Sequence, residues 1–260
     1  MSESDLLYEV TDEIGLLTFN RPQARNALTF EMYERFSEIC ANAPTDGSVK
    51  VIIITGAGEK AFAAGTDISQ FWDFGTPEQG IAYEQNAERT FSSVALCPLP
   101  TIAAIGGACT GGGAGIAAVC DMRIASADLR YGFPISRTLG NLLSAATLAR
   151  LVDLMGEAKL LDIILTSRLI EAGEALASGI VGEILPDHEA LMARAWQLAR
   201  RIKDNAPLTM RATKTLLRRL REARPRVDDD DVVGSVYSSA DFREGLEAFL
   251  AKRKPQWQGR

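Results

Sequence analysis

The sequence predicts an α/β fold in which helices pack against a largely parallel sheet. Two segments, Val49–Thr55 and Thr101–Ile105, are rich in apolar and β-branched residues, as strands buried on both faces are. Helical patterns alternate with these strands along the first part of the chain. A glycine cluster, Gly111–Gly115, follows the second strand and precedes an apolar run at Ile116–Cys120, which is typical of a turn that opens a buried helix.

The elements before the glycine cluster are predicted, in order, as a hairpin of strands Leu6–Val10 and Ile14–Phe19, a helix N-capped by Thr29 and ending near Ala43, the strand Val49–Thr55, a loop at Gly56–Gly65, and a helix from about Pro77 to Leu96. The polar run Thr11-Asp12-Glu13 supplies the turn of the hairpin. Proline in the first turn of the long helix, and Pro98 beyond its end, fix its two boundaries.

After the glycine cluster the sequence predicts a strand at Met122–Ala125 and then mainly helices from about Leu143 onward. The last segment, after Pro207, is charged and helical, with predicted helices at Thr209–Leu220, Asp230–Ala240 and Phe242–Lys252. The acidic run Asp228–Asp231 is expected to cap the next helix, because its aspartates lack the alternating spacing of a metal-binding loop.

Composition places the chain among globular proteins of the cytoplasm. It has 260 residues, of which 47% are hydrophobic, and this is enough to bury a large core. A net charge of -6 argues against nucleic acid as a partner. The polar, acidic N-terminus resembles no targeting signal, and no apolar stretch approaches membrane-spanning length. The four cysteines, which are scattered and form no CxxC pair, are expected to be buried free thiols (Cys40, Cys97, Cys109 and Cys120).

Several mechanisms are disfavoured by what the sequence lacks. The single histidine, His188, sits at a predicted helix start on the surface, so neither a serine–histidine triad nor a histidine-rich metal site is expected. No phosphate-binding P-loop motif occurs. The segment Gly56–Ala61 matches a loose dinucleotide fingerprint after a strand, but no amphipathic helix follows it. No metal and no separate cofactor are therefore predicted.

Two glycine-bearing turns remain, and each follows a buried strand. One is Ala64-Gly65-Thr66, and the other is Gly111-Gly112-Gly113. If the two strands are neighbours, the backbone N–H groups of Thr66 and Gly112 converge on one point and form an oxyanion hole. Alternatively, the glycines serve only the close packing of backbones. The spacing alone leaves both interpretations open.

The motifs along the chain resemble those of the enoyl-CoA hydratase/isomerase (crotonase) family. The matching segments are the opening signature Asn20–Leu28, a first oxyanion loop at Lys60–Ile68, a second at Gly111-Gly112-Gly113 with Cys120–Ala125 after it, a short strand at Tyr131–Pro134 beside the active site, and a C-terminal helix at Asp241–Leu246 extending to Lys254. The resemblance implies a spiral of repeated β-β-α units over residues 1–200 and a helical oligomerisation region over 201–260. It also implies a homotrimer, usually paired into a hexamer.

The same resemblance implies an acyl-CoA thioester substrate, with coenzyme A as part of the substrate. Its carbonyl oxygen would lie between the N–H groups of Thr66 and Gly112, the expected catalytic groups. The residues expected to border the ligand are Ala24, Ala64, Asp67 and Ile68 along the nucleotide and pantetheine arm, Pro134 and Arg137 at the acyl pocket, and Phe249 with Lys252 reaching the ligand of a neighbouring subunit.

The chain departs from the family pattern at both catalytic acids. Hydratases of this family use two glutamates, and this sequence has Gly115 and Ile135 (or, with a shift of one residue, Ser136) in their places. Neither glycine nor isoleucine transfers protons, so ordinary hydration is not expected. An external base such as bicarbonate in the space at Gly115 is one substitute for the lost acids.

Several residues are weighed as replacement groups. Ser136, Arg137, Thr138 and Asn141 fall in the loop that would wall the acyl pocket, and Arg137 could hold a substrate carboxylate. Three acids near the pocket rim are expected to be solvated surface residues rather than catalysts: Asp73, Glu78 and Glu84. An aromatic group nearby either lines the acyl pocket or packs in the core: Phe71, Trp72 and Phe74.

Three functions follow from these expectations. The first is enolate-stabilising lyase or isomerase chemistry on an acyl-CoA. The second is a thioester hydrolase or decarboxylase that uses the same oxyanion hole. The third is an acyl-CoA-binding homologue without catalytic activity.

Overall fold

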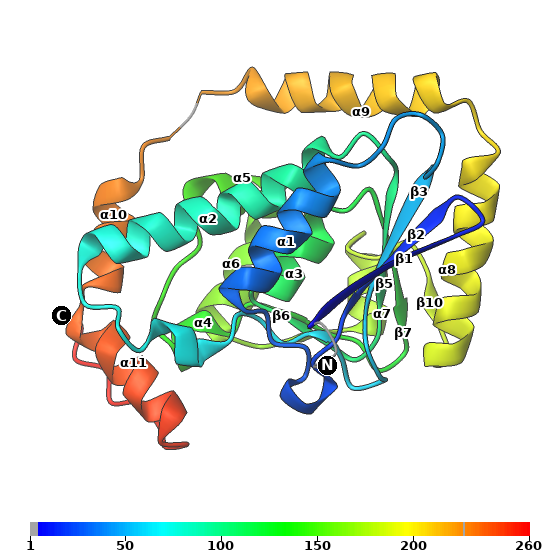
Figure 1. The fold of residues 1–260 in the computed structure, drawn as a ribbon. Helices are drawn as coiled ribbons and strands as arrows, with labels where there is room; N and C mark the ends of the chain where they lie inside the picture. The colour runs from blue at the N-terminus through cyan, green and yellow to red at the C-terminus, as the bar shows by residue number, and fades with distance from the viewer. Residues whose placement is uncertain (1–4, 226) are drawn as a thin grey trace.

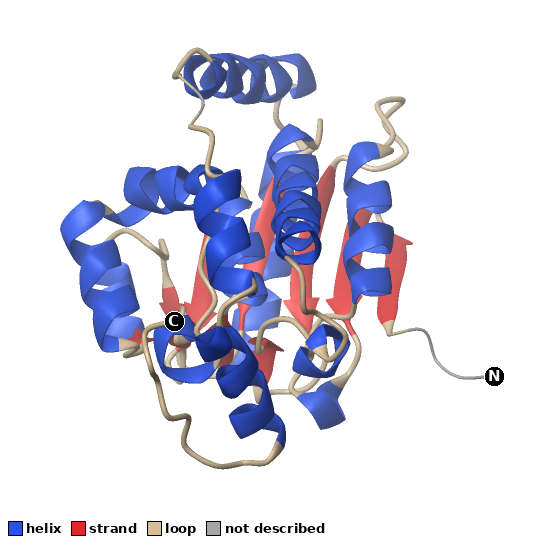
Figure 2. Cartoon of the chain, turned by 90° about the vertical axis from the view of Figure 1, so that its left-hand side faces the viewer, coloured by secondary structure: helices blue, strands red, loops and turns tan. Residues whose placement is uncertain are grey.

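The computed structural model describes residues 5–225 and 227–260 and shows two sheets enclosed by helices (Figures 1 and 2). The larger sheet has the strand order β1-β2-β3-β5-β7-β10, and the smaller has the order β4-β6-β8-β9. The strands of the larger sheet are β1 (Leu6–Thr11), β2 (Ile14–Phe19), β3 (Val51–Gly56), β5 (Thr101–Ile105), β7 (Met122–Ser126) and β10 (Ile184–Leu185). Those of the smaller sheet are β4 (Ala61–Ala63), β6 (Ala108–Thr110), β8 (Arg130–Gly132) and β9 (Ile170–Glu171).

The predicted parallel sheet is confirmed. Strand β2 pairs with β3, β3 with β5, β5 with β7 and β7 with β10, all in parallel, and β1 completes the predicted hairpin with β2. In the smaller sheet β4, β6 and β8 are parallel, and β9 runs antiparallel to β8.

The chain repeats one unit three times, and this repeat is the expected spiral. Each unit places one strand in the larger sheet, the next strand in the smaller sheet, and then a helix. The units are β3-β4 with α2 (Pro77–Leu96), β5-β6 with α3 (Gly112–Val119), and β7-β8 with α4 (Ile135–Thr138). Because equivalent strands lie side by side, the turns after β4 and β6 are brought to the same edge of the smaller sheet.

The other helices complete the two outer layers and the C-terminal region. In chain order they are the 3-10 helix η1 (Pro22–Ala24), α1 (Phe30–Ala41), the 3-10 helix η2 (Ile68–Phe71), α5 (Ala145–Met155), α6 (Glu157–Thr166), α7 (Ala172–Ala177), α8 (His188–Lys203), α9 (Pro207–Glu222), α10 (Asp230–Tyr237) and α11 (Ala240–Leu250). Thr29 caps α1 as predicted, since its side chain accepts a hydrogen bond from the N–H of Met32. Of the strands of two or three residues, β8 was expected from the family resemblance at Tyr131–Pro134, whereas β4, β6, β9 and β10 were not predicted.

The core lies on both faces of the larger sheet. On one face, side chains such as Phe36 of α1 and Ile116 of α3 pack against the sheet, and on the other, Leu191 and Leu198 of α8 pack against Ile53 and its neighbours. All four cysteines are buried and free, as predicted. Among the described residues, no helix is both long and apolar enough to cross a membrane.

A third cluster of buried side chains joins the C-terminal helices to the site region. Phe71 and Leu139 pack there with Tyr237 of α10 and with Phe242 and Leu246 of α11.

Helix α10 begins at Asp230 as predicted but ends earlier, at Tyr237, because Ser239 caps a new helix by accepting a hydrogen bond from the N–H of Phe242. Helix α11 accordingly begins and ends two residues earlier than predicted. The acidic run begins α10 as predicted, with Asp229 at the N-cap and Asp230 and Asp231 in the first turn. The Asp229 side chain does not cap this helix, however, and accepts a hydrogen bond from the N–H of Ala145, at the start of α5, at 2.6 Å.

Candidate active site

The two glycine turns lie against each other. Gly65 and Gly111 both have positive φ angles, 102° and 53°, which favour glycine. A Cβ atom placed on Gly111 would come within 3.4 Å of Gly65 Cα, and one on Gly65 would lie 3.9 Å from the nitrogen of Gly112. The parallel pairing of β4 with β6 causes this contact, because the turns are the continuations of neighbouring strands.

Each turn presents a backbone N–H group without a hydrogen-bond partner among the described residues. Gly112 is the first residue of α3, where an N–H has no acceptor within its own helix. At the other turn, Leu28 pairs with the backbone on either side of Thr66: it donates to Gly65 O and accepts from Asp67 N, both at 2.8 Å. The N–H of Thr66 takes no part in this pairing. The arrangement suits an oxygen atom that carries negative charge.

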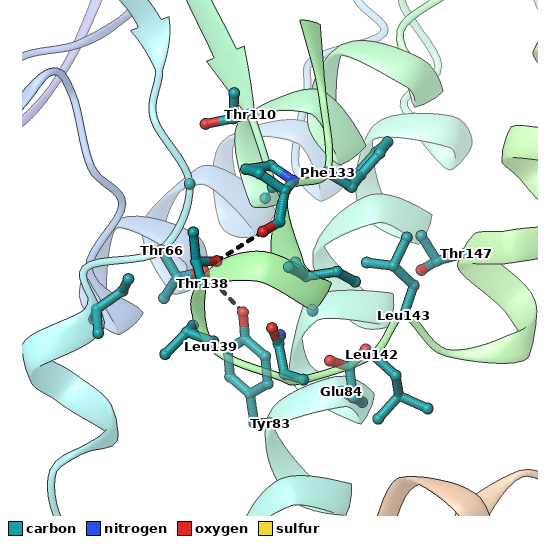
Figure 3. Close-up of a pocket in the computed structure, with 18 of the residues that line it drawn as sticks. Thr66, Tyr83, Glu84, Thr110, Phe133, Thr138, Leu139, Leu142, Leu143 and Thr147 are labelled. Carbon is teal, nitrogen blue, oxygen red and sulfur yellow. Dashed lines mark hydrogen bonds between the residues drawn. The ribbon is translucent and has the colours of Figure 1, made fainter. Parts of the chain in front are cut away.

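A largely apolar cavity opens beside these turns (Figure 3). Its walls come from the two turns, η2, α2 and the segment from Phe133 to Thr147. Of the residues predicted from the sequence, those lining the cavity are Ala64, Thr66, Ile68, Gly112 and Pro134, together with Phe71, Glu84, Ile135, Thr138 and Asn141. Those outside its lining are Ala24, Asp67, Arg137, Phe249 and Lys252.

The residues outside the lining occupy three places. Ala24 closes η1, and Asp67 forms an ion pair with Arg21 at 2.9 Å beside it. Arg137 is exposed on α4. Phe249 and Lys252 lie at the exposed end of α11, at the surface of this single chain. Of the neighbouring candidates, Ser136 bonds to Ser167 Oγ at 2.7 Å, and Asp73 and Glu78 are exposed.

No free space exists at Gly115. A Cβ atom on this residue would lie 2.5 Å from the tip of the Phe91 ring, which comes from α2 and lines the cavity. The expectation that an external base occupies this space is therefore wrong, since an aromatic ring fills it. Ile135, at the other usual acid position, is buried and lines the cavity as an apolar residue.

Glu84 is not the solvated surface acid that the sequence favoured. It is only 7% exposed, and it is the one carboxylate that lines the cavity among the described residues. Its Oε1 accepts a hydrogen bond from the Tyr237 hydroxyl at 2.6 Å, and its Oε2 accepts one from the N–H of Ser144 at 3.2 Å. Burial raises the pKa of Glu84 to about 7, although these two hydrogen bonds oppose the shift.

Three hydroxyl groups meet at the first turn, and two of them were not predicted from the sequence. Thr66 Oγ1 lies 2.9 Å from the hydroxyl of Tyr33 and 2.8 Å from that of Tyr83, which lines the cavity. Burial raises the pKa of Tyr33 to about 12 and that of Tyr83 well above its usual range, so both are neutral phenols near pH 7. The signal was available for Tyr83, which directly precedes Glu84 on a helix assigned to the pocket rim.

The aromatic group beside the cavity has mixed roles. Phe71 lines the cavity and is also buried, with its ring centroid 4.7 Å from that of Tyr83. Phe74 packs against both of these rings. Trp72 is 57% exposed and stands outside the cluster. Both predicted interpretations, pocket lining and core packing, therefore apply to Phe71.

No group of three or more metal-ligating side chains gathers within the described part of the chain. The His188 ring lies at the start of α8, next to Gly106 and away from the cavity lining. The site therefore offers backbone N–H groups, phenol and threonine hydroxyls, and one buried carboxyl group.

Comparison with known proteins gives a consistent result over the whole chain. Residues 9–260 match the model of the family described as enoyl-CoA hydratase/isomerase. A short-chain-enoyl-CoA hydratase from Clostridium acetobutylicum is 33% identical over 264 residues, covering 98% of this chain and 97% of that protein.

Solved structures of similar proteins share the fold. An enoyl-CoA hydratase/carnitine racemase from Magnetospirillum magneticum is 34% identical, with a TM-score of 0.80 and coverage of 100% of this chain and 97% of the other. A methylmalonyl-CoA decarboxylase in complex with 2S-carboxypropyl-CoA is 26% identical, with a TM-score of 0.88 and full coverage of both chains.

Proposed function

The chain belongs to the enoyl-CoA hydratase/isomerase family, and we propose that it is an acyl-CoA enzyme that stabilises a thioester enolate between the N–H groups of Thr66 and Gly112. The observation that carries this proposal is the contact of the two turns, which leaves two unpartnered backbone donors of the described chain beside an apolar cavity. Each such donor contributes about 3 kcal/mol to the stability of an oxyanion in the transition state. The acyl chain occupies the cavity of Figure 3.

The coenzyme A part of the substrate extends away from the cavity along the first turn. Ala64 and Ile68 border it at the cavity wall, and Ala24 and Asp67 lie on the adjoining η1 and η2 segments. In an oligomer, Phe249 and Lys252 reach the nucleotide end of a ligand bound to the neighbouring subunit. Their exposure at the end of α11 supports this role.

Loss of carbon dioxide from a 2-carboxyacyl-CoA is the reaction that best fits a site without acids at positions 115 and 135. Hydration and isomerisation both need a base at the reacting atoms, but Gly115 is covered by Phe91, Ile135 is apolar, and the Glu84 carboxyl group is held by Ser144 and Tyr237 rather than at the glycine turns. Decarboxylation needs no base: the bond between the α-carbon and the carboxylate breaks, and its electron pair moves toward the thioester oxygen. An apolar cavity favours this step, because it disfavours the localised charge of the substrate carboxylate.

A panel of CoA esters tests the proposed function. Purified protein is incubated with enoyl-, 3-hydroxyacyl- and 2-carboxyacyl-CoA esters, and the products are followed by mass spectrometry. We expect loss of carbon dioxide from a 2-carboxyacyl-CoA. Rapid addition of water to the enoyl esters would contradict the importance of the missing acids, and release of free CoA would favour the hydrolase. Binding without turnover of any ester would favour the non-catalytic homologue.

Gly112→Ala tests the oxyanion hole itself. A Cβ atom there would lie 1.8 Å from the Tyr33 hydroxyl, so the turn must move and the N–H group must leave its position. We expect turnover to fall by about 100-fold or more. Gly173→Ala is the matched control, because no atom lies within 4 Å of an added Cβ at that position. Equal turnover in the two variants would contradict the assigned donor.

A further inference from the structure

We propose that the Tyr83 hydroxyl is the proton donor that converts the enolate to product. This inference rests on the proposed function, since it assigns a role to a second group of the same site. The proton moves from the phenol oxygen to the α-carbon: the O–H bond breaks, the electron pair of the enolate forms the new C–H bond, and the thioester carbonyl re-forms. The resulting phenolate regains a proton from water as product leaves.

The position of Tyr83 supports this role. Its hydroxyl lies 2.8 Å from Thr66 Oγ1, on the residue whose N–H is proposed to hold the thioester oxygen, and both residues line the cavity. Figure 3 shows the phenol pointing toward Thr66 from α2. The α-carbon of a bound thioester is one bond from the carbonyl carbon. The phenol is therefore at the reacting end of the cavity.

The order of the hydroxyl protons supplies the second argument. Three hydroxyls carry three protons, and the two close hydrogen bonds that join them both meet at Thr66 Oγ1. Tyr33 is buried outside the cavity lining, so its hydroxyl proton must be accepted within the cluster, by Thr66 Oγ1 at 2.9 Å or by the Tyr83 hydroxyl that it also contacts. Leaving that proton unpaired would cost about 1–3 kcal/mol. In the favoured arrangement, Tyr33 therefore donates to Thr66, and Thr66 donates to Tyr83.

That order leaves the proton of Tyr83 free to be donated outside the cluster. The Tyr33 hydroxyl donates to Thr66 and so sets the orientation of the Thr66 hydroxyl. Thr66 in turn donates to Tyr83, so that the O–H of Tyr83 faces the cavity. A phenol is a much stronger acid than the α C–H group of a thioester, so this proton transfer to the enolate is downhill. Thr66 acts here as a positioning residue through its hydroxyl.

Other proton-bearing groups line the cavity, among them the hydroxyls of Thr110 and Thr147, but within the described lining only Tyr83 hydrogen-bonds to Thr66. Thr138 Oγ1 donates to the carbonyl of Pro134 at 2.9 Å. The Glu84 carboxyl group is held at Ser144 and Tyr237, and neither of these contacts involves the glycine turns. Tyr83 is therefore the donor that the geometry assigns to the reacting end.

Decarboxylation of methylmalonyl-CoA in D₂O tests the proposal. We expect the wild-type protein to form 2-deuteropropionyl-CoA of one configuration. In Tyr83→Phe, we expect product formation to slow by about 100-fold and the configuration of the label to be lost, because water then supplies the deuteron from either face. The affinity for propionyl-CoA should stay within about twofold, since the phenyl ring remains in the cavity wall.

Tyr8→Phe is the matched control, because Tyr8 lies on β1 and packs against Gly15 outside the cavity lining. Thr66→Val and Thr66→Ser form a second pair. The valine keeps the backbone N–H but removes the hydroxyl, so partial loss of configuration is expected, whereas serine should restore it. Thermal unfolding of each variant separates a folding defect from a loss of chemistry.

The outcomes separate this inference from the function on which it rests. Wild-type rate and a single configuration in Tyr83→Phe would overturn the role of Tyr83 and leave the oxyanion hole intact. Failure of the wild-type protein to decarboxylate methylmalonyl-CoA would overturn the proposed decarboxylation, and the role of Tyr83 would fall with it. A slower variant that keeps one configuration would also contradict the assignment.

Discussion

Gly115 is a position at which one neighbouring ring decides which side chains fit. In the sequence it appears as a vacancy left by a missing acid. In the structure the Phe91 ring covers it, and a methyl carbon added to Gly115 would lie only 2.5 Å from that ring, which leaves no room for a side chain. The glycine at position 115 is therefore matched by an aromatic side chain on α2 that fills the space beside it. The sequence pattern alone could not reveal this contact.

We expect Gly115→Ala to lower the free energy of unfolding by about 1–3 kcal/mol, because the added carbon displaces the Phe91 ring in a packed region. Urea unfolding measures the change. Gly173→Ala, at an open position, should be neutral or slightly stabilising. The free energy of unfolding of the double variant Gly115→Ala/Phe91→Leu should fall by less than the sum of the losses in the two single variants. Stabilisation by Gly115→Ala alone would contradict the contact.

Glu84 should make stability depend on pH. The folded protein holds this proton up to about pH 7, whereas the unfolded chain releases it near its ordinary pKa of 4.5. The folded state therefore binds more protons between these values. A contribution of about 3 kcal/mol is fully present below pH 4.5 and is lost as the pH rises to about 7.

In Glu84→Gln, this part of the pH dependence should disappear. The measurement is the slope of the unfolding free energy between pH 4.5 and 7, compared with that of the wild type. Glu59→Gln changes an exposed acid and should leave the slope unchanged. An identical slope in Glu84→Gln and wild type would show that the carboxyl group titrates normally.

At the scale of elements, the turn after β2 is held by one buried amide. Asn26 accepts a hydrogen bond from the N–H of Arg21 and donates two, to the carbonyls of Ala57 and Ala61, at 3.0 and 2.7 Å. It thereby ties the opening signature to the strand that leads to the first oxyanion turn.

Asn26→Ala should lower the free energy of unfolding by about 2–4 kcal/mol, because buried carbonyl groups lose their donors. Chemical denaturation checks this value. Asn205→Ala, at an exposed position, should change stability by less than about 0.5 kcal/mol. A loss in Asn26→Ala no larger than in this control would argue against the anchoring role.

The sequence predicted long elements better than short ones. The strands β2, β3, β5 and β7 and the helix α2 carry enough periodicity to be recognised. The three-residue strands β4 and β6 do not, yet their pairing brings the two turns together. The strand β8 was expected only from the family resemblance. The two glycine turns were therefore predictable from their motifs and glycines. The hydroxyl cluster and the burial of Glu84 were not, because they depend on where α2 and α10 pack.

On the scale of the whole molecule, α9 has no buried residue and stands at the edge of the fold (Figure 1). Its exposed leucines are Leu208, Leu216, Leu217 and Leu220. Lys214 holds the helix to the body through Asp121 and the carbonyl of Leu99, at 2.5 and 2.8 Å. An apolar helix face of this kind suits contact with another copy of the chain.

We expect the protein to sediment as a trimer or a hexamer, as the family resemblance implies. Leu216→Glu combined with Leu220→Glu should shift the protein to smaller species in analytical ultracentrifugation, because two charges replace apolar contacts on one helix face. Leu165→Glu, which changes an exposed leucine of α6, is the control. A monomeric wild type would contradict the expectation.

The role proposed for Lys252 would link oligomer assembly to ligand binding. If it reaches the phosphates of a ligand in the neighbouring subunit, Lys252→Ala should weaken acyl-CoA binding by about tenfold in the assembled protein. Isothermal titration with butyryl-CoA checks this. Lys254→Ala, two residues further along the exposed tail, serves for comparison. Equal affinities in the two variants would remove Lys252 from the ligand site.

The Phe91 ring also bears on how this protein changes over evolutionary time. An acid that arises at position 115 meets the ring and gains no access to substrate, and loss of the ring alone leaves a gap with no new reactivity. Neither step is useful without the other. Conversion of this site to a two-glutamate pattern therefore requires coupled substitutions on α2 and α3 together with a further one at Ile135 on α4, which makes it a change of several steps.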